Sequence, residues 1–271
     1  MKKSLLPTDA VRTLFVAAGL ALALFGLPAG AETPEEKGLA IAREADHRDQ
    51  GFGDNVATLQ MILKNRQGEE SKRELRSKTL EVQGDGDKSL VIFDEPADVK
   101  GTALLTFTHK TDDDNQWLYL PALKRVKRIA SDNKSGPFMG SEFAYEDLTS
   151  QEVEKYTYKW LRDDKLDGAD VFVFERYPVD KNSGYTRQVV WMDKAEYRPL
   201  RIEYFDRKNS ALKTLVFKDY KQHLSKHWRA DDMYMENHQT GKSTRLLWKN
   251  YKFKTGQTAR DFDQNALARA K

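Results

Sequence analysis

Short alternating segments separated by turn residues constrain the fold of this chain more than any other feature. Leu59, Met61 and Leu63 alternate with polar neighbours, and further segments up to residue 252 have the same period. Turn residues such as Asp167-Gly168 separate these segments. A period of two is typical of a half-buried β-strand. Evenly spaced strands joined by tight turns predict an antiparallel meander that is closed, or nearly closed, into a barrel.

Residues 1–31 have the pattern of a secretory signal peptide, with Lys2 and Lys3 before an apolar run and Ala29-Gly30-Ala31 at its end. A membrane anchor is the alternative, but the run at residues 14–27 is shorter than the roughly 20 residues of a span. The chain has no Cys, so neither lipid attachment at a lipobox nor a disulfide framework is expected. We expect a cleaved signal peptide and one periplasmic domain at residues 32–271.

The mature chain is predicted to open with a helix. Thr33 is a suitable N-cap, Pro34 suits the first helical position, and Glu36 completes a capping box. An apolar stripe follows, so we expect a helix over residues 34–48 that ends before Gly51.

Residues 115–145 combine features that seldom occur together. An aromatic strand at residues 117–120 is followed by a basic strand at residues 124–129 and then by a polar loop. The loop nevertheless carries four large apolar or aromatic side chains: Phe138, Met139, Phe143 and Tyr145. Since loops usually run over the surface, such a loop is either clamped onto a core or lies over a groove. We favour the groove.

A groove lined by aromatic residues and Met could hold an acyl chain. The alternative is an ordinary packed core, because most apolar strand faces are core. The candidate ligand-binding residues of the cavity and its lid are Trp117, Tyr119, Phe138, Met139, Phe143, Tyr145, Trp191, Tyr204 and Trp248.

The layout and residues 114–148 resemble the LolA/LolB superfamily of outer membrane lipoprotein-sorting proteins. Asp114-Asn-Gln-Trp117-Leu-Tyr119-Leu-Pro121 is similar to that family's aromatic strand, and Gly136-Pro137-Phe138-Met139 is similar to its lid segment. The resemblance implies a half-open antiparallel barrel of about 11 strands, with an N-terminal helix and a helical lid over residues 131–148. In the carrier branch an Arg beside a Pro bonds to the lid and holds it shut. The matching pair here is Glu95-Pro96, so whether the lid of this protein is held in the same way stays an open question.

The resemblance implies a periplasmic carrier that binds acyl chains of lipoproteins or lipids and takes part in their transport to the outer membrane. Expected partners are the acyl chains, an inner-membrane transporter, an outer-membrane acceptor and a transient membrane contact. The alternative is an adaptor of an envelope lipid transporter that carries no cargo. The identity of the cargo stays open.

The densest basic run is Lys124, Arg125, Lys127 and Arg128. These side chains could contact anionic headgroups or an acidic partner, or they could protect a solvated edge strand. Both interpretations stay open.

Composition and motifs argue against other classes of protein. With 45 Lys and Arg against 42 Asp and Glu, the chain is close to neutral, so no nucleic-acid partner is expected. His223 and His227 have the i, i+4 spacing of metal ligands but lie between predicted strands. We find no nucleophile or dinucleotide motif, and expect no catalytic residue, metal or cofactor.

Overall fold

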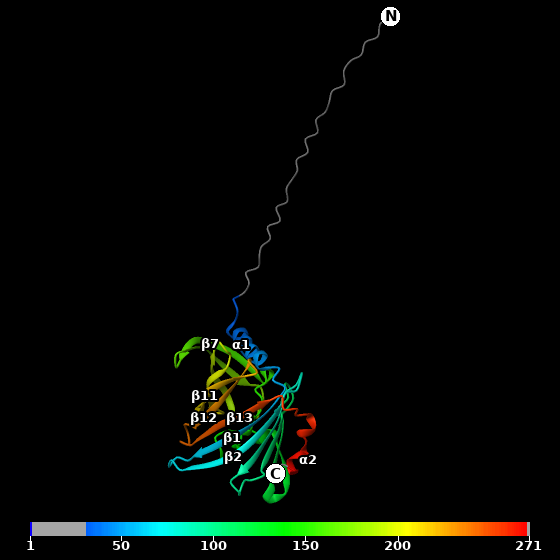
Figure 1. The fold of residues 1–271 in the computed structure, drawn as a ribbon. Coiled ribbons are helices and arrows are strands. Elements are labelled where there is room, and N and C mark those ends of the chain that lie inside the picture. Colours follow the sequence, from blue (N-terminus) through cyan, green and yellow to red (C-terminus); the bar gives the residue numbers. More distant parts are fainter. Residues whose placement is uncertain (2–30, 270–271) are drawn as a thin grey trace. The chain divides into compact units, whose positions relative to one another are not determined.

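The computed structural model describes Met1 and residues 31–269, and residues from Glu32 onward form one compact unit. The predicted signal peptide therefore lies almost entirely outside the described residues. A single sheet of 13 antiparallel strands dominates the unit (Figure 1). Its strands are β1 (Asp54–Lys64), β2 (Glu70–Leu80), β3 (Lys88–Glu95), β4 (Ala103–Phe107), β5 (Asn115–Leu120), β6 (Arg125–Ile129), β7 (Tyr156–Leu166), β8 (Ala169–Pro178), β9 (Tyr185–Asp193), β10 (Pro199–Asp206), β11 (Ala211–His223), β12 (His227–Asn237) and β13 (Ser243–Phe253).

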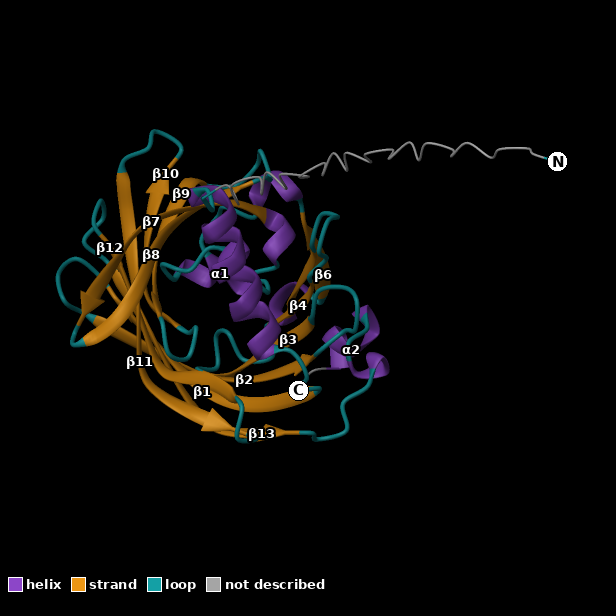
Figure 2. Ribbon diagram, turned by 90° about the horizontal axis from the view of Figure 1, so that it is seen from above, coloured by secondary structure: helices purple, strands orange, loops and turns teal. Residues whose placement is uncertain are grey.

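The strand order is β6-β5-β4-β3-β2-β1-β13-β12-β11-β10-β9-β8-β7, so β1 pairs with β13 and the sheet has two free edges, β6 and β7. The prediction of an antiparallel meander is confirmed. The sheet curves strongly without closing into a barrel (Figure 2). It has 13 strands rather than the 11 or so that the resemblance implied. The short strands β5 and β6, which the sequence predicted, pair along their whole length.

Helix α1 (Pro34–Asp49) lies on the concave side of the sheet (Figure 2). The predicted capping box is confirmed: the backbone N–H of Glu36 donates to the Thr33 hydroxyl, and the Glu36 carboxylate accepts from the Thr33 backbone. Close packing on β7 depends on Gly38, where a Cβ atom would lie 2.9 Å from the backbone nitrogen of Trp160. Position 38 therefore accepts only glycine without a shift of helix or strand.

The connection from β6 to β7 crosses the concave side as four short 3-10 turns. These turns are η2 (Ser131–Asn133), η3 (Phe138–Gly140), η4 (Tyr145–Leu148) and η5 (Val153–Lys155). Two further 3-10 turns, η1 (Pro121–Leu123) and η6 (Ala259–Asp261), lie elsewhere. We call residues 131–153 the crossing segment. It forms short turns where the family resemblance implied a helical lid.

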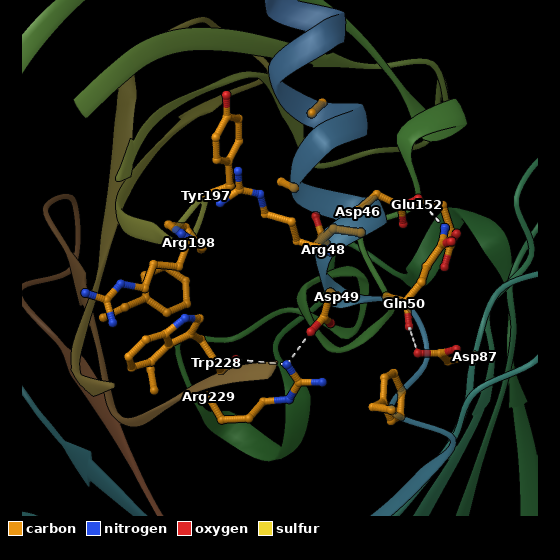
Figure 3. Close-up of a pocket in the computed structure, with 18 of the residues that line it drawn as sticks. Asp46, Arg48, Asp49, Gln50, Asp87, Glu152, Tyr197, Arg198, Trp228 and Arg229 are labelled. Carbon is orange, nitrogen blue, oxygen red and sulfur yellow. Dashed lines mark hydrogen bonds and ion pairs between the residues drawn. The ribbon is translucent and has the colours of Figure 1, made fainter. Parts of the chain in front are cut away.

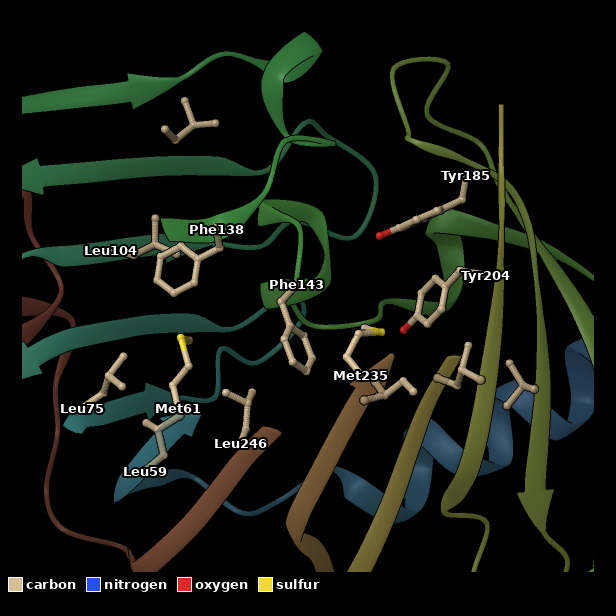
Figure 4. Packing of buried hydrophobic residues seen from close by; sticks show 14 of the residues in the cluster. Leu59, Met61, Leu75, Leu104, Phe138, Phe143, Tyr185, Tyr204, Met235 and Leu246 are labelled. Atoms are coloured by element: carbon tan, nitrogen blue, oxygen red, sulfur yellow. The ribbon is translucent and has the colours of Figure 1, made fainter. Parts of the chain in front are cut away.

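Apolar side chains cover both faces of the sheet. The main core on the concave side joins Leu59, Met61, Leu75, Leu104 and Leu246 to Phe138 and Phe143 of the crossing segment (Figure 4). On the convex side, the short helix α2 (Gln264–Arg269) and its flanking Phe262 pack on β4, β5 and β6. A smaller convex cluster contains Val171, Val173 and Val189.

Candidate functional site

A cavity of about 1100 Å³ opens on the concave side, between α1, the later part of the crossing segment and the strands β7 to β13. Parts of β1 and β2 and the connection from β2 to β3 complete its wall. This volume is in the range of ligand pockets in proteins. Residues that are register partners on neighbouring strands form rows across the sheet. The polarity of the cavity wall therefore changes from row to row along the strands.

The middle rows of the cavity wall are apolar. One row joins Phe174, Val190, Ile202 and Leu215, which are successive register partners on β8, β9, β10 and β11. Met192, Phe217 and Met233 continue the apolar surface toward the mouth. Such a surface is suited to a hydrocarbon chain and offers it no hydrogen-bonding partner.

The mouth has arginine residues on one side (Figure 3). Arg198 stacks over Trp228 at 4.4 Å and pairs through Nε with the Asp193 carboxylate at 3.2 Å. Arg229 Nη1 lies 2.5 Å from Asp49 Oδ1 at the end of α1. Each of these cations already has an acidic partner.

Carboxylates occupy the other side of the mouth (Figure 3). Burial raises the pKa of Glu152 to about 7, and the nearby Asp87 and Asp46 carboxylates add to the rise. Burial likewise raises the pKa of Asp87 to about 6. Repulsion among desolvated carboxylates favours the protonated forms here.

A polar row lies at the inner end of the cavity, and two of its members, Arg176 and Tyr204, line the wall. Arg176, Gln188, Tyr204, Lys213 and Asn237 are successive register partners on β8 to β12. Arg176 Nε donates to Gln188 Oε1 at 2.7 Å. The hydroxyl groups of Tyr185 and Tyr204 point inward beside Met235 (Figure 4).

Lys213 and Asn237 of this row hold the crossing segment. Lys213 Nζ donates to Asp147 Oδ2 at 2.7 Å and to the Glu142 carbonyl at 2.8 Å. Asn237 Nδ2 donates to the Glu142 carboxylate at 2.7 Å. The Tyr185 hydroxyl also donates to Asp147. The segment is therefore bonded to β9, β11 and β12 by buried polar groups.

A second anchor of the crossing segment comes from β2. Arg73 Nη1 donates to the carbonyl of Met139 at 2.6 Å. We matched the family's latch position to Glu95, which is exposed on β3. The arginine that bonds to the crossing segment is instead Arg73, on the adjacent strand β2. The sequence match at Glu95-Pro96 did not identify this arginine.

The structure brings three of the predicted ligand-binding residues to the cavity: Phe143, Tyr204 and Trp248. Trp117, Tyr119 and Trp191 pack in the convex clusters instead. For these three the expectation of a cavity position was wrong, because α2 and neighbouring strands bury apolar side chains on the convex face as well. On β5 the inward residues are Gln116 and Leu118.

Irregular strand pairing determines which side chains of β9 lie on the concave side. A register shift near Tyr185 places that residue on the concave side with Val190 and Met192, while Val189 and Trp191 are convex. A bulge of this kind reverses the side on which a residue lies. A similar shift on β13 brings both Trp248 and Tyr251 to the cavity.

Phe138, Met139 and Tyr145 point inward but belong to the main core and not to the cavity wall. The Phe138 ring is 1% exposed, and its centroid lies 5.7 Å from that of Phe93 and 5.6 Å from that of Tyr145. Met139 and Tyr145 are half-buried against the same core. The first part of the crossing segment, which includes Phe138, is thus part of the packed core.

The basic run lies at a free edge of the sheet. Arg125, Lys127 and Arg128 are exposed on β6, and Lys124 precedes that strand in a left-handed conformation. None of the four lines the cavity. The placement fits a solvated edge strand and leaves a surface contact open.

His223 and His227 are register partners across the β11–β12 turn. The His227 ring stacks on Phe253, and the His223 ring packs against the same side chain at a tilt. Burial lowers the pKa of both rings. Within residues 31–269, no three His, Asp or Glu side chains are grouped as metal ligands would be. No helix in that range is long and apolar enough to cross a bilayer.

Sequence patterns did not identify Arg176, Lys213 and Asp147. Each is one charged residue among many in a charge-rich chain, and nothing in its local sequence marks it as buried. Only the register of four strands, β8 to β11, brings Arg176 and Lys213 into one row.

Comparisons with known proteins agree with this architecture. A family model described only as an uncharacterized protein matches residues 85–269. A crystal structure from Vibrio parahaemolyticus, provisionally named an outer membrane lipoprotein-sorting protein domain, is 62% identical, with a TM-score of 0.85 over 86% of this chain and 99% of that chain. A DUF1329 family protein from Desulfovibrio piger is 30% identical, with a TM-score of 0.82 over 87% of this chain and 99% of that chain.

A LolA superfamily protein from Nitrosomonas europaea shares the fold, with 19% identity and a TM-score of 0.68 over 84% of this chain and 97% of that chain. No curated protein matches the sequence. The fold of the chain is LolA-like. The chain belongs to the family that includes the provisionally named sorting-protein domain of Vibrio parahaemolyticus and the DUF1329 protein of Desulfovibrio piger.

Proposed function

We propose that this protein is a periplasmic carrier that binds acyl chains of lipids or lipoproteins and takes part in their transport to the outer membrane. The observation that carries this proposal is the cavity of about 1100 Å³ with an apolar middle and polar groups at both ends. Burying hydrocarbon there stabilises the complex by about 25 cal/mol per Å² removed from water. The Vibrio relative that is provisionally named for lipoprotein sorting supports the same role.

The crossing segment is the part of the protein that we propose to act as a lid. It forms one wall of the cavity through Phe143, Asp147 and residues 149–153. Its anchors are individual polar contacts, from Arg73 and Lys213 among others. Local release of such contacts would widen the cavity into the region now filled by Phe138, as lids do on binding or release.

A second function, an adaptor that docks on an envelope transporter without cargo, is favoured by one observation. The exposed side chains of β6 lie beside Leu123, which is 67% exposed. In the carrier proposal the same surface meets the inner-membrane donor, the outer-membrane acceptor or anionic headgroups. The carrier function requires a cavity that can admit a ligand, whereas the adaptor function does not.

Filling the cavity separates these functions. Ala45 of α1 lines the cavity, whereas Ala40 lies exposed on the same helix. Ala45→Trp should abolish uptake of a fluorescent fatty-acid probe, while Ala40→Trp should bind the probe as the parent does. Equal binding by both variants, with both folded by circular dichroism, would remove the carrier proposal and leave the adaptor.

A further inference from the structure

Arg176 stands at the inner end of the cavity without an acidic partner. Its Nε–H donates to the neutral Gln188, and its guanidinium carbon lies 4.6 Å from the centre of the Tyr156 ring. Within residues 31–269, no carboxylate lies within ion-pairing distance of this side chain. A guanidinium has five N–H donors, so most of its donors remain available to a ligand in the cavity.

The pKa values of the neighbouring phenols show how closely Arg176 is surrounded. Burial raises the pKa of Tyr156, Tyr158 and Tyr204, and the positive charge of Arg176 opposes the rise in all three. The nearby Lys213 is already neutralised by Asp147. Arg176 is thus a cation without a direct ion-pair partner among aromatic rings, and the buried Glu146 and Asp147 carboxylates act on two of the same rings, Tyr156 and Tyr204.

Filling the cavity with hydrocarbon makes this arrangement unfavourable. Water can solvate the guanidinium while the cavity is empty, but an acyl chain displaces that water. A desolvated charge without a counter-ion is costly. If the methyl end of the acyl chain lay beside Arg176, the guanidinium would be desolvated without a counter-ion. An anionic end at the same place would supply the counter-ion.

The arginines of the rim are less available to an anion, because Arg198 is paired with Asp193, Arg229 with Asp49, and Arg48 with Glu44. The two lysines of the rim also have polar neighbours: Lys226 donates to the Gln50 carbonyl, and Lys110 acts on the Glu152 carboxylate. Tyr204, in the same row as Arg176, is five residues along β10 from Pro199 at the rim. At about 3.3 Å per residue, roughly 17 Å of strand separates the two levels. The apolar rows lie between them.

We propose that the cavity binds a single-chain amphiphile with an anionic head, a carboxylate or a phosphate, and that the head enters first to pair with Arg176. The inward hydroxyl of Tyr204 supplies a further donor. The proposal rests on the acyl-chain function above and narrows its cargo from acyl chains in general to free anionic amphiphiles.

The test compares ligands of equal chain length. Palmitate, hexadecyl phosphate and hexadecanol are titrated against the purified mature protein, with tryptophan fluorescence as the readout, since Trp228 and Trp248 line the cavity. Both anions should bind about tenfold or more tightly than the alcohol, as expected for a charge-assisted hydrogen bond. If only one anion shows this advantage, that anion identifies the head group. Arg176→Met should remove the advantage without changing the affinity for hexadecanol, and Arg176→Lys should retain part of it.

Arg187 provides the matched control. It lies on β9, pairs with Glu175 at 2.9 Å and stacks on the convex Phe205, so Arg187→Met should leave all three affinities unchanged. Equal binding of acid and alcohol by the parent, or an equal loss of all three ligands in Arg176→Met, would overturn the head-first proposal alone. Failure of the parent to bind any of the three would overturn the acyl-chain function with it.

Carboxyl-labelled palmitate gives an independent readout of orientation. With the head beside Arg176, carbon-13 resonance should show a lower pKa for the bound carboxyl group in the parent than in Arg176→Met. The same pKa in both proteins would place the head outside and contradict the proposal.

Discussion

Lys213 Nζ lies 2.7 Å from Asp147 Oδ2, and each of the two side chains is 5% exposed. The pair joins β11 to the crossing segment, while the Tyr185 hydroxyl donates to the same carboxylate. This buried network holds the wall of the cavity to the sheet, so its disruption should affect both stability and ligand exchange.

Lys213→Met should lower the free energy of unfolding by about 3–5 kcal/mol, because it leaves the Asp147 carboxylate buried without its partner. Urea unfolding measures the change. Lys221→Met is the control, since Lys221 is 67% exposed in its pair with Asp231 and should contribute about 1 kcal/mol or less. Equal effects of the two variants would show that the Lys213 pair is not isolated from water in solution.

Phe138→Ala should destabilise the protein by about 3–5 kcal/mol, as expected for a fully buried aromatic side chain. Leu123→Ala, at an exposed position, should change the free energy of unfolding by about 0.5 kcal/mol or less. A small effect at Phe138 would indicate that η3 is released from the core for much of the time in solution.

Glu152 should make the protein less stable as pH rises. Its pKa is about 7 in the folded state, above the ordinary 4.5, because of burial and the nearby Asp87 and Asp46. Between these pH values the folded state holds a proton that the unfolded state has lost, so the free energy of unfolding falls from about pH 4.5 to about pH 7. Glu152→Gln should reduce that fall in thermal melts at pH 5 and pH 8.

The exposed Glu154 supplies the control for this pH dependence. Glu154→Gln should keep the parental difference between pH 5 and pH 8. An unchanged difference in Glu152→Gln as well would mean that Glu152 is hydrated and ionised in the folded protein.

Changing Lys124, Arg125, Lys127 and Arg128 together to Ser should weaken association with anionic lipid vesicles or an acidic partner. The effect should decrease as salt rises, because exposed charges are screened over about 10 Å at 0.1 M salt. Vesicle sedimentation at low and high salt measures this. Equal association of parent and variant at low salt would identify β6 as a solvated edge strand only.

Local sequence signals predicted the strands and the first helix well. The alternation of Leu59, Met61 and Leu63 and the capping box at Thr33 and Glu36 both correspond to observed elements. These features depend on neighbours within a few residues. The implied count of about 11 strands was too low, although the short strands β5 and β6 were themselves predicted at residues 117–120 and 124–129.

The site was predictable only in part, because it depends on pairing between distant strands. Phe143, Tyr204 and Trp248 reach the cavity, but register shifts and the α2 helix place Trp191 and Trp117 on the other face. Arg176 acquires its position from partners on β7 and β9. No local pattern distinguishes it from the many exposed arginines of the chain.

Native mass spectrometry of the protein isolated from the periplasm, followed by lipid extraction, tests the carrier function most directly. The account predicts a bound amphiphile in the parent, retained in Ala40→Trp and absent from Ala45→Trp, since only Ala45 lines the cavity. A parent protein that is free of lipid and takes up none when incubated with periplasmic lipid extract would contradict it.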